Sequence, residues 1–141
     1  MDWLHITLLN LVVTAYMTGV IWMCQIVHYP LLSKVGIDHL PDYQLANTRL
    51  TTWVVLPPML AELGLTVWML TAAPTVQMSL VVTGAGLLAV CWGSTFLFQV
   101  PQHRRLLHSF EKPAWLKLVR SNWIRTVAWS ARTVIACLLL W

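Results

Sequence analysis

The 141-residue sequence is short of charged residues, and above all of acidic ones. Only 10% of its residues are charged and five are Asp or Glu, whereas 58% are apolar. A soluble domain of this length could not bury so much apolar surface, because its surface is large relative to its volume. The composition therefore predicts an integral membrane protein in which residues 1–141 form a single domain.

The sequence also lacks the motifs of several enzyme classes. It has no nucleophile elbow, no phosphate-binding loop and no Cys-x-x-Cys pair. Its lysines lie in connectors or at the edge of a span, which argues against a retinal-type Schiff base. Cys24, Cys91 and Cys137 fall in different spans at different depths, so no disulfide framework is expected.

Four apolar stretches are present, and each is long enough to cross a bilayer. They cover approximately residues 4–28, 52–73, 79–100 and 115–141. A helix needs about 20 residues to cross about 30 Å of hydrocarbon. The sequence therefore predicts an all-α fold, an antiparallel bundle of four transmembrane helices.

Prolines are expected to shape these helices. Pro30 should end the first helix, because the residue before a proline disfavours helical backbone angles. A short helix at the membrane surface should begin at Pro41, before the second span. Within that span Pro57 and Pro58 should kink the helix, and the third helix should continue through residues 102–108.

Basic residues indicate the orientation of the bundle. They gather in the segments between spans one and two and between spans three and four, and are absent from the link at Ala72–Ser79 and from both ends of the chain. The positive-inside rule then places both basic connectors in the cytoplasm and both termini outside the cell membrane. The net charge of +4 thus reflects topology and does not indicate a nucleic-acid partner.

Each span carries polar residues at helical spacing on one face. Such residues are costly in lipid and usually face a bundle interior, a partner or a cavity. Because the four stripes approach the same end of the bundle, we expect a polar site near the cytoplasmic interface. The stripes are Asn10, Thr14, Thr18, Gln25 and His28; Glu62 and Thr66; Thr95, Gln99 and His103; and Asn122, Arg125, Trp129 and Arg132.

One interpretation of these stripes is purely structural. Glu62 and Arg125 lie at similar depths and would form an ion pair, since buried charges need partners. Arg132 lies about two turns deeper, too far from either surface to reach water easily, and should also pair inside the bundle.

A functional interpretation adds the histidines. His28, Glu62 and His103 could form a two-histidine, one-carboxylate metal site contributed by three helices. Imidazole can also ligate haem or carry protons near neutral pH, so the cofactor stays open, with a transition metal first and haem as the alternative. Polar and aromatic side chains that would surround such a cofactor are Gln25, Gln99, Trp129 and Arg132.

Two stretches carry a family resemblance. Trp115–Thr126, with its Asn122-x-x-Arg125 pair, and Gln99–Leu106, with Pro101 in its polar element, resemble the anthrone-oxygenase-like family of small four-helix membrane proteins. The resemblance implies oxidation of a hydrophobic, aromatic substrate, with Asn122 and Arg125 in the pocket. The family has asparagines where this chain has Gln99 and His103. The segments around Pro30 and Glu62 are similar to a bacterial subgroup, which implies an inner-membrane location.

Three functional hypotheses follow. The first is a membrane oxidoreductase or oxygenase, metal-dependent or not, that acts on a lipophilic small molecule. In it His28 or His103 moves protons or ligates a metal, Glu62 is a base or ligand, and Asn122 with Arg125 holds an oxyanion. The second is a haem- or quinone-binding or assembly subunit without turnover, and the third is a purely structural membrane protein or a small pore. Membrane lipid is the expected partner in each, and a homo-oligomer stays open.

Overall fold

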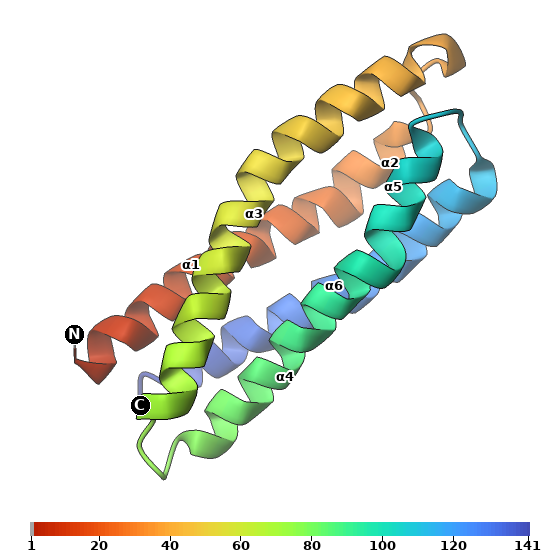
Figure 1. Ribbon diagram of the computed structural model, residues 1–141. Helices are drawn as coiled ribbons and strands as arrows, with labels where there is room; N and C mark the ends of the chain where they lie inside the picture. The colour runs from red at the N-terminus through yellow and green to blue at the C-terminus, as the bar shows by residue number, and fades with distance from the viewer. Residues whose placement is uncertain (1) are drawn as a thin grey trace.

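A computed structural model describes residues 2–141, without the side chain of Ile37, as four long helices joined by short connectors (Figure 1). The first long helix consists of α1 (Trp3–Met23), η1 (Cys24–His28) and α2 (Tyr29–Leu32). After the short turn η2 (Ile37–His39), the second is α3 (Leu40–Ala72). The third consists of α4 (Met78–Ser94), η3 (Thr95–Gln99) and α5 (Val100–Leu106), and the fourth is α6 (Lys112–Leu138).

The long helices form an antiparallel bundle, which confirms the all-α fold class. α1 packs against α3 and α6, and α4 packs against the same two helices from the other side. Both termini and the α3–α4 link lie at one end, and the connectors at 33–39 and 107–111 lie at the other (Figure 1). We call this second end the basic end, because Lys34, Arg104 and Arg105 lie there.

The outer surface of the bundle is apolar. Trp53, Leu97 and Val127, on three different helices, are 74%, 69% and 63% exposed. Three helical segments are long and apolar enough to cross a membrane: Trp3–Leu32, Leu40–Ala72 and Met78–Leu106. These helices indicate a multi-pass membrane protein. The segment predicted as the fourth span forms helix α6, which is long enough but is not among these three segments, since it carries several basic residues.

The first helix does not end before Pro30 as predicted, but continues to Leu32. It does so through a π-helical turn, in which the Tyr29 amide donates to the carbonyl of Cys24, five residues earlier. Proline has no amide hydrogen, and its ring would clash with the carbonyl four residues before it in a regular α-helix. The wider turn removes that clash and lets the helix pass the proline.

The third long helix also passes a proline by means of a π turn. The Val100 amide donates to the carbonyl of Thr95, again five residues earlier, and Pro101 follows directly. Beyond this π turn α5 continues to Leu106, which confirms the predicted extension of the third helix except for its last two residues. Both helices therefore carry a π turn before a proline, near the basic end.

The two π turns decide which side chains face inward. From buried Ile21, a regular helix would return to the inside at His28, but the extra residue brings Tyr29 there and leaves His28 partly exposed. From buried Cys91, the regular position would be 98, and Gln99 is buried instead.

Helix α3 begins at Leu40, with Pro41 in its first turn, and runs without interruption to Ala72. The separate surface helix predicted from Pro41 is therefore wrong: the segment is the first part of the second span. Pro57 and Pro58 lie inside the helix, which changes direction near its middle (Figure 1). Pro41 suits the start of this helix, because an amide hydrogen in the first turn has no helical partner.

Candidate functional site

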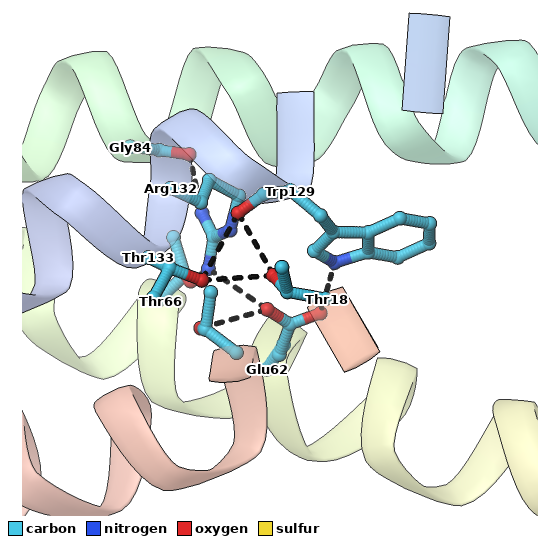
Figure 2. Close-up of polar contacts among 8 residues, drawn as sticks. Thr18, Glu62, Thr66, Gly84, Trp129, Arg132 and Thr133 are labelled. Atoms are coloured by element: carbon cyan, nitrogen blue, oxygen red, sulfur yellow. Dashed lines mark hydrogen bonds and ion pairs between the residues drawn. The ribbon is translucent and has the colours of Figure 1, made fainter. Parts of the chain in front are cut away.

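The deepest polar group is a carboxylate surrounded by three side chains, the Glu62 cluster of Thr14, Glu62, Trp129 and Arg132 (Figure 2). Glu62 is fully buried on α3. Thr14 Oγ1 on α1 donates to its Oε1 at 2.8 Å, and Trp129 Nε1 on α6 donates to its Oε2 at 2.9 Å. Arg132 Nη2 lies 3.4 Å from Oε1 and neutralises the charge. Side chains from three helices thus converge on one carboxyl group.

Arg132 extends this cluster to α4, the one long helix not yet included. Its Nη1 donates to the carbonyl oxygen of Gly84 on α4, and its Nη2 donates to Thr66 Oγ1 at 3.4 Å (Figure 2). Nearby, Thr18 Oγ1 on α1 donates to the carbonyl oxygen of Trp129 at 3.1 Å and shares a 2.8 Å hydrogen bond with Thr133. Buried polar groups that are paired in this way hold helices together where lipid offers no hydrogen bonds.

The ion pair corrects one sequence-based prediction and confirms another. Glu62 pairs with Arg132 and not with Arg125, to which no acidic side chain of residues 2–141 forms a salt bridge. Arg125 and Arg132 lie two helical turns apart on the same face. An estimate of depth from residue numbers therefore selected Arg125 as the partner of Glu62 instead of Arg132. The expectation that Arg132 finds an internal partner is confirmed.

A cavity of about 480 Å³ lies between the helices toward the basic end. We call it the Arg125 cavity; the residues that line it include His28, Tyr29, Met59, Gln99, His103 and Arg125. Much of its wall is apolar, from side chains such as Val20, Ile21 and Val55. Both π turns contribute to its lining, which places Tyr29 and Gln99 at the cavity in agreement with their inward rotation.

Arg125 is held in place by polar contacts within the bundle. Its Nη1 donates to Asn122 Oδ1 at 3.4 Å, and its guanidinium carbon lies 5.1 Å from the centre of the Trp129 ring. Asn122 in turn donates through Nδ2 to Gln25 Oε1 at 2.9 Å, and Gln25 Nε2 donates to the Val119 carbonyl at 3.3 Å. This chain orients the amide that fixes the guanidinium.

A second chain of hydrogen bonds reaches the cavity from α3. Gln44 Nε2 donates to His103 Nδ1 at 2.7 Å, and His103 Nε2 lies 3.4 Å from the Tyr29 hydroxyl oxygen. Because Nδ1 accepts, Nε2 carries the hydrogen and donates to Tyr29. The hydroxyl hydrogen of Tyr29 is then free to donate to a second acceptor. Asn47 Nδ2 donates to Gln44 Oε1 at 3.4 Å and continues the chain.

The three residues predicted to bind a metal are not brought together. His28 and His103 line the Arg125 cavity, but Glu62 does not and is engaged by Arg132. Within the described part of the chain, no three His, Cys, Asp or Glu side chains are grouped so that they could hold a metal ion. The reason is again depth, since the Glu62 cluster lies further into the bundle than the histidines.

The other predicted site residues divide between the two regions. Gln99 lines the cavity, whereas Gln25 and Asn122 lie behind Arg125 and support it. Trp129 contacts both regions, donating to Glu62 and facing Arg125 with its ring.

Comparison with known proteins found no family model, no curated protein and no solved structure that matches the chain.

Two residues of the second chain of hydrogen bonds were not predicted as site residues. Tyr29, which lines the cavity, was considered only as the end of a helix, and Gln44, which reaches the cavity through His103, fell in the predicted surface helix without a role. The signal for Tyr29 was the following proline, since a helix that continues past a proline can need a π turn. Nothing in the sequence singled out Gln44, because its contact depends on how α3 packs against α5.

Proposed function

We propose that this protein spans the membrane four times and oxidises a lipophilic substrate in the Arg125 cavity. The observation that supports this most directly is the cavity itself, in which apolar walls surround polar groups from all four long helices. Its volume of about 480 Å³ is in the range of small-molecule sites. Such a combination suits a hydrophobic molecule with one reactive polar end.

A fourth span is supported by the distribution of charged and apolar residues between the inner and outer faces of α6. Arg125 and Arg132 are 5% and 4% exposed, so these charges are directed into the bundle. The outward side of the same stretch carries exposed apolar residues such as Ile124, Val127 and Val134. A helix with its charges inside and apolar side chains outside is compatible with lipid.

The orientation proposed for the four spans puts the basic end in the cytoplasm. It can be tested in a variant without native cysteines, with a new cysteine at Arg49 or at Thr75. An impermeant thiol reagent added to intact cells should label the Thr75→Cys variant and spare the Arg49→Cys variant. The opposite pattern would reverse the topology.

The polar groups suit removal of a proton next to a carbonyl group. His28 takes the proton, and the electron pair moves to the carbonyl oxygen, where Arg125 and the Tyr29 hydroxyl donate to the developing oxyanion. Molecular oxygen is the oxidant: the carbon loses two hydrogens, one oxygen atom becomes the new carbonyl oxygen, and the other leaves as water. This reaction fits the resemblance to anthrone-oxygenase-like proteins. Glu62 has no part in it, because Arg132 already engages this carboxylate.

An oxygen-uptake assay tests the proposal. Protein in nanodiscs should consume oxygen with a tricyclic aromatic ketone that carries an acidic methylene group, and the matching quinone should accumulate. Arg125→Met and His28→Gln should each lower the rate by about 100-fold or more. Arg120→Met is a matched control, since Arg120 lies on the same helix but is exposed and outside the cavity. Uptake that is independent of Arg125 and His28 would contradict the proposed site.

A further inference from the structure

The interior of the bundle has one positive charge more than its acids can neutralise. Asp2, Asp38, Asp42 and Glu111 are exposed, so Glu62 is the one buried acid among residues 2–141. Arg125 and Arg132 are both buried, and Glu62 forms its ion pair with Arg132. Arg125 therefore keeps its full charge without an acidic partner from this part of the chain.

Arg125 also has unused hydrogen-bonding capacity. A guanidinium group has five N–H donors. Arg125 makes one long hydrogen bond, to Asn122, and its buried Nε has no partner among the described residues. A buried cation in this state is costly unless an anion completes it. The guanidinium lines the cavity, so an anion can reach it there.

We infer that the occupant of the Arg125 cavity is a lipophilic acid whose ionised oxygen pairs with Arg125, and that it reaches the cavity sideways from the bilayer between α3 and η3. This inference rests on the cavity of the proposed function and names the class of molecule that it takes. The apolar walls favour a molecule with a hydrophobic body over a small inorganic anion.

The sideways path follows from residues that belong both to the cavity and to the outer surface. Leu56 on α3 and Phe96 on η3 line the cavity, yet they are 42% and 60% exposed. Thr48 and Arg104, toward the basic end, are likewise exposed and line the cavity. These exposed lining residues form the mouth of the cavity. One part of the mouth is apolar and faces lipid, and the other part is polar and basic and lies near the membrane surface, as suits an amphiphilic acid.

Binding of acids and their methyl esters tests the ligand class. Radiolabelled oleic acid and anthracene-9-carboxylic acid, each with its ester, are measured on protein in neutral nanodiscs at alkaline pH, with empty nanodiscs subtracted. At least one acid should bind at least about tenfold more tightly than its ester, and Arg125→Met should remove the difference. The exposed-site variant Arg120→Met should keep it.

A second variant guards against misfolding of the first. Asn122→Asp puts a carboxylate 3.4 Å from Arg125 Nη1, where the amide oxygen now lies. It should abolish the preference for the acid while the protein stays folded, because the new ion pair with Arg125 offsets the loss of the Asn122 donor to Gln25 Oε1. Equal affinities of acid and ester in the unaltered protein, or a preference that survives in both variants, would overturn the inference. Displacement of the acid by phosphate or chloride at equal concentration would overturn the lipophilic class.

Association rates test the path. Leu56→Trp narrows the mouth and should slow association of the acid by about fivefold or more, whereas Leu60→Trp, on the exposed face of α3 and outside the cavity, should not. An unchanged rate in Leu56→Trp would overturn sideways access. If acid binding depends on Arg125 but no oxygen is consumed, the oxidation is wrong and this inference stands. If oxygen is consumed but acids bind no more tightly than their esters, the inference about acids is wrong and the proposed oxidation stands.

Discussion

Two buried arginines lie two turns apart on α6, and the bundle treats them differently. Arg132 lies near the ion-pair partner Glu62, the carbonyl of Gly84 and the hydroxyl of Thr66. Arg125 has one long bond to Asn122 and faces a cavity. A buried charge that forms an ion pair within its own chain, a matched charge, stabilises the fold. A buried charge without such a partner, an unmatched charge, is available to bind a ligand. Residue type and burial alone would not separate the two.

The largest expected effect is loss of the matched charge. Glu62→Gln leaves Arg132 without its counterion and should lower the free energy of unfolding by about 3–5 kcal/mol. The double variant Glu62→Gln/Arg132→Met should lose much less than the sum of the two single losses. Unfolding in mixed detergent gives all three values. Additive losses would mean that the two residues do not stabilise each other.

Removal of the unmatched charge, that of Arg125, should change the free energy of unfolding in the opposite direction. Arg125→Met replaces a buried cation that lacks a carboxylate with an apolar side chain of similar length. The free energy of unfolding should rise by about 1 kcal/mol or more when no ligand is bound. Measured beside Arg132→Met, which should destabilise, it compares the two arginines directly. A loss as large as that of Arg132→Met would show that Arg125 has a structural partner.

A smaller loss of stability is expected when the hydroxyl contacts that join α1 to α6 near the Glu62 cluster are removed. Thr18→Val removes the donor to the Trp129 carbonyl and the bond to Thr133 while keeping the shape of the side chain. The free energy of unfolding should fall by about 1 kcal/mol. The valine variant should keep full binding at the Arg125 cavity, since Thr18 does not line it.

The smallest effect is expected for Arg120, the exposed arginine on α6. Arg120→Met should change the free energy of unfolding by less than about 0.5 kcal/mol, because solvent already satisfies this charge. The same detergent series measures it. A large loss would mean that exposure on this helix is a poor guide to the role of its arginines.

The sequence predicted the helices better than it predicted their contacts. Apolar length located four helices, and spacing of three and four residues placed Asn122, Arg125, Trp129 and Arg132 on one face. Spacing cannot say which of two arginines on the same face meets an acid from another helix, so Glu62 was paired with the wrong one. That choice depends on the relative height of α3 and α6, which is set by packing.

The histidines show a second limit. The polar stripe that runs through Thr18 and Gln25 on the first span predicted that His28 also faces inward. The π turn adds one residue to the helix, so Tyr29 takes the fully buried position and His28 lies half-buried in the wall of the cavity. Periodicity predicts a face only while the helix keeps its pitch, and before Pro30 and Pro101 the pitch changes, whereas α3 passes Pro57 and Pro58 without a π turn.

The same π turns have a consequence for how this chain and its homologues can diverge. Each one amounts to a single inserted residue, kept because the proline after it would otherwise meet a carbonyl group. A homologue that replaces Pro30 loses the steric reason for that insertion, and so does one that replaces Pro101. Loss of either proline should therefore be accompanied by a one-residue deletion within the five or so residues before it. An alignment that forbids gaps inside helices would place the residues around Tyr29 and Gln99 one position out of register.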